Sequence, residues 1–71
     1  MYYAMLWADG TVLDTKIRRT IEEAVEALRQ DFLASGGEPS EAIATMWSEI
    51  ASGTSKEVRL VTGLTGSLNE D

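Results

Sequence analysis

The first eighteen residues show the pattern of two β-strands joined by a tight turn. Residues 2–8 form a short, aromatic-rich apolar run that ends at Asp9-Gly10. Asp-Gly between apolar runs is a strong hairpin signal, because both residues tolerate the positive φ that a type I′ turn requires. The sequence therefore predicts a first strand over residues 2–8 and a return strand over residues 11–18.

A two-residue turn also predicts which side chains share a face of the hairpin. With Ala8 opposite Thr11 and Trp7 opposite Val12, the expected inner face comprises Tyr2, Ala4, Leu6, Leu13, Thr15 and Ile17. The expected far face comprises Tyr3, Met5, Trp7, Val12, Asp14 and Lys16. A slip of one residue would exchange the two faces, so this assignment depends on an uninterrupted ladder.

Two amphipathic helices are predicted after the hairpin. The first begins at the capping box Thr20-Ile21-Glu22-Glu23 and ends near Ser35, before Gly36-Gly37. Pro39 suits the first position of the second helix, where its missing N–H costs no hydrogen bond, and that helix is expected to reach Ser52. Each helix carries an apolar stripe at the 3.6-residue period.

A third strand is predicted over residues 57–62, and residues 64–71 are expected to form a loosely ordered tail. Residues 1–71 are thus expected to be a single small α+β domain, with a three-stranded, mainly antiparallel sheet and two helices packed on one face, in the order β-β-α-α-β. The pattern leaves open whether the third strand joins the first or the second. The predicted core comprises Tyr2, Leu6, Leu13, Ile17, Ile21, Val25, Leu28, Phe32, Ile43, Met46, Trp47, Ile50, Val58 and Leu60.

The composition argues against enzymatic chemistry. Twelve acidic and six basic residues give a net charge of −6, and the chain has neither histidine nor cysteine. A nucleophilic serine would need a lysine or carboxylate base, and Ser55-Lys56, adjacent in a turn, does not provide that geometry. The segment Ser52–Lys56 follows a helix and opens a strand, which is the reverse of a phosphate-binding loop. Glutamates on regular helix surfaces rarely converge on a cation. We therefore expect a protein that is not an enzyme, with no cofactor and no metal.

The same composition bears on location and on partners. The apolar start is too short to span a bilayer and lacks the basic segment of a secretory signal, so we expect a soluble cytoplasmic protein. A charge of −6 repels nucleic acids and anionic membranes, so no direct nucleic-acid or membrane binding is expected. The charge suits a basic protein surface instead.

Two surfaces are candidates for contact with such a partner. The first is an acidic helix surface whose carboxylates could take the place of phosphates, namely Glu22, Glu23, Glu26, Asp31, Glu38, Glu41 and Glu49. An alternative is that these residues only solvate the helices. The second is the far face of the hairpin, with Tyr3, Trp7 and Asp14, because exposed aromatic patches mark contact sites. The alternative there is that the tail, with Leu64 and Leu68, folds over this face.

In its small size, its acidity and its lack of catalytic side chains, the whole chain resembles small phage-encoded inhibitors, especially anti-CRISPR proteins. This resemblance implies a non-enzymatic inhibitor whose acidic surface blocks a basic nucleic-acid-binding surface of a CRISPR effector in a bacterial host cell. A different expectation, based on the hairpin face, is a small structural or assembly module that homodimerises or docks a larger protein. The sequence leaves the choice between monomer and homodimer open.

Overall fold

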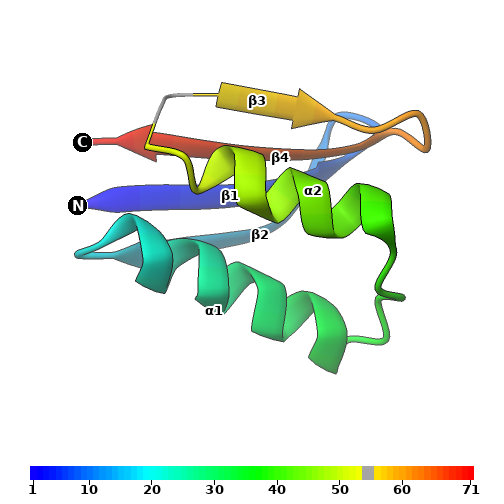
Figure 1. Cartoon of the computed structure of the whole chain (residues 1–71), viewed down its shortest axis with the longest axis horizontal. Helices are drawn as coiled ribbons and strands as arrows, with labels where there is room; N and C mark the ends of the chain where they lie inside the picture. The colour runs from blue at the N-terminus through cyan, green and yellow to red at the C-terminus, as the bar shows by residue number, and fades with distance from the viewer. Residues whose placement is uncertain (54–55) are drawn as a thin grey trace.

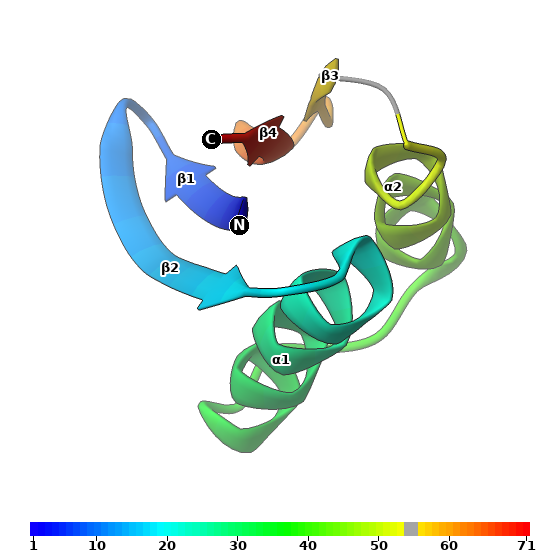
Figure 2. The same ribbon diagram turned by 90° about the vertical axis from the view of Figure 1, so that its left-hand side faces the viewer.

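The computed structural model describes residues 1–53 and 56–71, and within these it contains two helices and a four-stranded antiparallel sheet (Figure 1). The elements in chain order are β1 (Tyr2–Ala8), β2 (Thr11–Arg18), α1 (Ile21–Ala34), α2 (Glu41–Ile50), β3 (Lys56–Arg59) and β4 (Leu64–Glu70). Figure 2 shows a curved sheet with both helices on one side of it. The α+β class predicted from the sequence is confirmed, whereas the count of three strands is wrong.

The additional strand is β4, which lies in the interior of the sheet. The strand order is β2-β1-β4-β3, so β4 pairs with β1 on one side and with β3 on the other. Residues 64–71 are therefore not a loosely ordered tail, and β3 joins neither strand of the hairpin. Leu68, opposite Ala4, is only 3% exposed and belongs to the core.

The sequence of β4 explains why its strand character is hard to recognise. Its residues, Leu-Thr-Gly-Ser-Leu-Asn-Glu, include a glycine and only two large apolar side chains. The glycine has a packing role, because a Cβ on Gly66 would come within 3.0 Å of the Met46 sulfur. Glycine within a strand often marks such a close approach, although by pattern alone it argues against a strand.

The hairpin turn is confirmed, but the expected register is kept only next to it. Asp9 and Gly10 both have positive φ, 49° and 79°, and Trp7 lies opposite Val12 as predicted. The ladder then shifts at a β-bulge, so that Leu6 lies opposite Asp14 and Leu13 is the extra residue. A bulge places two residues of one strand opposite one residue of its partner, and this exchanges the two faces of β2 beyond it.

The bulge corrects several assignments. Asp14 and Lys16, expected on the far face, lie on the side of the helices, whereas Thr15 and Ile17 lie on the far side. Leu13 and Ile17 are 56% and 47% exposed, so their assignment to the core is wrong. The sequence pattern could not reveal the exchange of faces, because a bulge is a change in strand pairing and has no characteristic residue types in β2.

The helix boundaries follow their caps. The Thr20 hydroxyl accepts the Glu23 backbone N–H at 3.1 Å, as the capping box predicts, and α1 starts at Ile21. In α2 the N-cap is Ser40, whose hydroxyl accepts the Ile43 N–H at 3.2 Å. Pro39 therefore precedes the cap instead of occupying the first helical position, because a serine side chain can satisfy a terminal N–H and a proline cannot.

The core lies between the sheet and the helices. Its buried members come from both helices and from the two inner strands: Ala4, Leu6, Ala24, Val25, Leu28, Met46, Trp47, Ile50 and Leu68. Phe32 of α1 and Trp47 of α2 meet edge to face, with ring centroids 5.7 Å apart, a favourable arrangement for aromatic rings. Strand β4 completes this core, since Leu68 and Gly66 lie under the helices.

The position of β4 makes a prediction about stability. Leu68→Ala should lower the free energy of unfolding by about 2–4 kcal/mol, because it removes a fully packed side chain and leaves a cavity. A small domain has only about 4–10 kcal/mol in total, so the loss should be evident in urea denaturation followed by circular dichroism.

The matched control is Val61→Ala in the turn between β3 and β4, where the side chain is fully exposed. It should change stability by no more than about 0.5 kcal/mol. Equal effects of the two substitutions would contradict the placement of Leu68 in the core.

Candidate functional site

The carboxylates predicted to bind a partner gather on the helix layer, the two helices and the segments next to them. Residues 19–50 contain seven acidic and two basic residues, so they carry −5 of the total charge of −6. All seven acidic residues are exposed: Glu22, Glu23, Glu26, Asp31, Glu38, Glu41 and Glu49. Because both helices lie on one side of the sheet, this side of the molecule is strongly negative (Figure 2).

These carboxylates differ in what they already contact. Glu26 accepts hydrogen bonds from the Arg29 guanidinium, with Nε to Oε2 at 2.9 Å, and from the Gln30 amide at 3.0 Å. The hydrogen bonds from Arg29, followed by that from Gln30, lower the pKa of Glu26 from 4.5 to about 2. Glu23 accepts the Thr20 hydroxyl at 2.9 Å. These two carboxylates are partly satisfied within α1.

Four of the acidic residues of the helix layer form neither an ion pair nor a side-chain hydrogen bond with any residue in the described ranges: Glu22, Glu38, Glu41 and Glu49. Their carboxylates are exposed to solvent. A partner's arginine or lysine could therefore pair with them without first displacing an internal cation.

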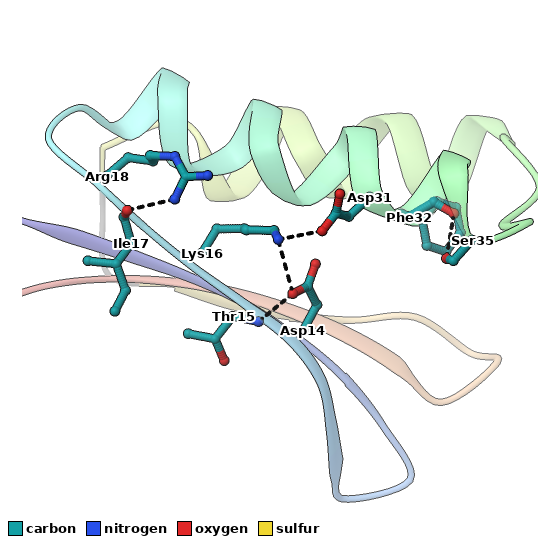
Figure 3. Close-up of polar contacts among 8 residues, drawn as sticks. All are labelled: Asp14, Thr15, Lys16, Ile17, Arg18, Asp31, Phe32 and Ser35. Atoms are coloured by element: carbon teal, nitrogen blue, oxygen red, sulfur yellow. Dashed lines mark hydrogen bonds and ion pairs between the residues drawn. The ribbon is translucent and has the colours of Figure 1, made fainter.

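Asp31 and Asp14 form a small network around Lys16 (Figure 3). The Lys16 ammonium lies 3.5 Å from Asp14 Oδ1 and forms an ion pair with Asp31 of α1. The hydrogen bond to Asp31 is the largest cause of the raised pKa of Lys16. Asp14, predicted to lie on the far face of the hairpin beside Tyr3 and Trp7, is instead held on the helix side by this network.

The network borders a shallow groove between β2 and the end of α1. The groove has a volume of about 700 Å³, and its apolar lining comes from Leu6, Leu13 and Phe32. Asp14 and Asp31 also line it. Leu13, the extra residue of the bulge, lines this groove and remains 56% exposed.

Two further carboxylates, missed by the sequence analysis, lie beside the first residues of β1: Glu70 and Asp71. Glu70 and, to a lesser degree, Glu22 raise the pKa of Tyr2 through their negative charge, with a hydrogen bond between Tyr2 and Glu70 as a second cause. A hydrogen bond to Asp71 is the largest cause of the raised pKa of Tyr3. No signal in the sequence relates residues 70–71 to the hairpin, since their position depends on the pairing of β4 with β1.

The outer sheet face, the side turned away from the helices, is different in character. It is formed by Tyr3, Met5, Trp7, Val12, Thr15, Ile17, Glu57, Arg59, Thr65, Ser67 and Asn69. Its contributions from β1, β2 and β4 contain no charged residue. The Trp7 indole N–H donates to the Ser67 hydroxyl at 3.4 Å. Residues 64–71, the predicted tail, do not fold over this face. As β4 they pair with β1 within the sheet and add their own side chains to the face.

The described part of the chain contains neither a cluster of metal-ligating side chains nor a membrane-spanning helix. Residues 1–53 and 56–71 contain no group of three or more acidic, histidine or cysteine side chains placed to hold a metal ion. Neither described helix has the length and apolar character needed to cross a membrane. Thr54 and Ser55 lie outside the described residues. The Ser55-Lys56 pair and the segment Ser52–Lys56, both considered in the sequence, therefore fall partly outside them.

Comparisons with protein families, with curated proteins and with solved structures find no match for this chain. The function must therefore be argued from the two surfaces themselves. The helix layer is acidic and exposed, and the outer sheet face is nearly uncharged.

The pairing of Glu26 with Arg29 makes a prediction about pH. The pKa of Glu26 should be about 2 in the folded protein, as measured by NMR titration of its carboxyl carbon. Because the folded pKa is lowered, the stabilisation from this carboxylate is present above about pH 4.5 and is lost as the pH falls toward 2. Glu26→Gln should remove this part of the pH dependence of stability.

Arg29→Gln provides the second arm, since it removes the cation and leaves the carboxylate. The titration midpoint of Glu26 should then return toward 4.5. An unchanged midpoint would show that Arg29 is not the cause of the lowered pKa.

Proposed function

We propose that the protein is a non-enzymatic inhibitor that binds a basic protein surface through its acidic helix layer. The target surface is one that normally holds nucleic acid. Following the resemblance to anti-CRISPR proteins, we propose a CRISPR effector as the target, in the cytoplasm of a bacterial host cell.

The observation that carries this proposal is the separation of charge across the molecule. The helix layer holds seven exposed carboxylates against two arginines, and the opposite face of the sheet is nearly neutral. Concentrated charge of one sign steers an oppositely charged partner and increases the rate of association by about 10- to 1,000-fold. It also orients the approach, since only one side of the molecule is attracted to a basic surface.

The chemistry of the carboxylates supports competition with nucleic acid. Carboxylates and phosphates both accept paired hydrogen bonds from the guanidinium of arginine, so a groove that binds phosphates can also bind aligned carboxylates. Glu22 and Glu41 each lie in the first turn of a helix that is packed on the sheet. Their backbone is therefore held in place before binding, which reduces the entropy lost on association.

The prediction concerns binding to purified, guide-loaded CRISPR effectors. At least one effector type should lose affinity for its target DNA when the protein is present, measured by a fluorescence anisotropy titration. The triple substitution Glu22→Gln, Glu41→Gln and Glu49→Gln should weaken this inhibition by about tenfold or more at physiological salt, because it removes three interfacial charges. Glutamine keeps the size and helix propensity of each side chain.

The matched control is Glu57→Gln, which removes an exposed carboxylate from the opposite side of the molecule. It should leave inhibition nearly unchanged. Raising the salt concentration should weaken the wild type more than the triple variant. Inhibition that is insensitive both to the triple substitution and to salt would overturn the electrostatic basis of the proposal.

A further inference from the structure

The outer sheet face has an unusual combination of size, composition and exposure. Three of its strands contribute nine side chains without a charge, in a protein in which a quarter of all residues are charged. Val12 and Ile17 are 43% and 47% exposed, and Tyr3, Met5 and Trp7 are half-buried beside them. Thr65 and Ser67 are buried, so these five side chains supply the accessible apolar surface, and a patch that contains aromatic side chains is typical of a protein interface.

The charge distribution indicates which partner this face fits. A second copy of the chain also carries a charge of −6, so two copies repel each other wherever their carboxylates approach. In a twofold contact the same patch meets itself, and any charged patch therefore faces like charge. The outer sheet face reduces this conflict. On its described strands the charged members are Glu57 and Arg59, which have opposite signs and lie together on the edge strand β3, and Asp71 lies at its rim beside Tyr3.

The edges of the sheet are less suited to self-association than its face. Strand β2 is interrupted by the bulge at Leu13 and carries Lys16 and Arg18, and β3 has only four residues. Bulges, charges and short length are the features that prevent edge-to-edge pairing of strands. Contact between two copies is therefore expected through the faces of their sheets.

From these observations we infer that the protein forms a homodimer in which the outer sheet faces of two copies pack against each other. Val12 and Ile17 of each copy lose contact with water, Met5 lies near the centre, and Trp7 lies at the hairpin end. Stacked sheets are about 10 Å apart, and the two helix layers lie beyond both sheets. Their carboxylates are thus separated by more than the Debye length of about 8 Å at physiological salt, so their repulsion is screened.

The area of the outer sheet face indicates how tightly two copies are expected to bind each other. Seven residues of β1 span about 23 Å, and four strands at a spacing of about 4.8 Å span about 15 Å. The product of these lengths is a flat footprint of about 350 Å² on each copy, or about 700 Å² in total, which is the size of a weak, transient interface. We expect a reversible dimer with a dissociation constant in the micromolar range, roughly 1–100 μM.

The dimer also has a consequence for binding to the target. This consequence, unlike the dimer itself, rests on the proposed function. Each copy directs its acidic helix layer outward, so a dimer offers two such surfaces on opposite sides. It would therefore bind two basic partners at once, and its avidity for a target with repeated subunits would exceed that of one copy.

Sedimentation equilibrium of the protein alone tests the dimer, at concentrations from about 1 μM to 1 mM, which bracket the expected dissociation constant. The wild type should change from monomer to dimer over this range. Ile17→Lys and Val12→Lys should each raise the dissociation constant at least about tenfold, because they bury an unpaired charge. Ile17→Thr, which keeps a β-branched side chain, should have a smaller effect in the same direction.

The matched control is Leu33→Lys on α1, which introduces the same charge at an exposed apolar position on the helix side. All three lysine variants reduce the net charge to −5, so a general decrease in repulsion favours association equally in each. Circular dichroism verifies that each variant is folded. Loss of the dimer in the two face variants but not in Leu33→Lys would support the inference.

Two results would overturn the inference: a wild type that remains monomeric at 1 mM, or a dimer that persists in both face variants at unchanged affinity. The first would indicate that the face is exposed or covered by a different protein, and the second would indicate another contact. Neither result bears on inhibition by the helix layer, because this experiment includes no partner and changes none of its carboxylates.

Discussion

The insertion of β4 between β1 and β3 is the constraint on which the rest of the structure depends. The hairpin carries α1 directly after it, and α2 leads to β3, so without β4 the two halves of the sheet would share no backbone hydrogen bonds. Leu68 contributes to the core that both helices share, and Gly66 allows Met46 to approach the strand. A domain of 71 residues buries only about 60% of the surface that its unfolded chain exposes, so its stability is marginal and the loss of this strand would be costly.

The β-bulge at Leu13 is the second device, and it determines what each face of the sheet presents. It turns Asp14 and Lys16 toward α1, where Lys16 pairs with Asp31, and it turns Ile17 outward (Figure 3). Without the bulge, β2 would present charges on the outer face and apolar side chains to the helices. One extra residue therefore makes the outer sheet face uncharged on three of its strands.

The two proposals use opposite sides of the molecule, and this division has a physical basis. The carboxylates on the helices that cover the sheet are exposed to solvent, so a basic partner can reach them. The uncovered side of the sheet has no such layer, so its side chains determine what it can contact. A protein of this size can thus bind a foreign surface with one side and a second copy with the other, without competition between the two.

The sequence by itself determined the local features, because each depends on residues close together in the chain. These are the Asp9-Gly10 turn, the start of α1 at its threonine cap, the apolar stripes of both helices and the exposure of the helix carboxylates. Only the tertiary structure decided the rest. Strand β4 is ordered by two partner strands, one of which, β1, is distant in the sequence, and the bulge is visible only in the pairing of β2 with β1. Long-range pairing and ladder defects leave little trace in local composition, and for this reason the acidic surface could be predicted in advance while the true outer face could not.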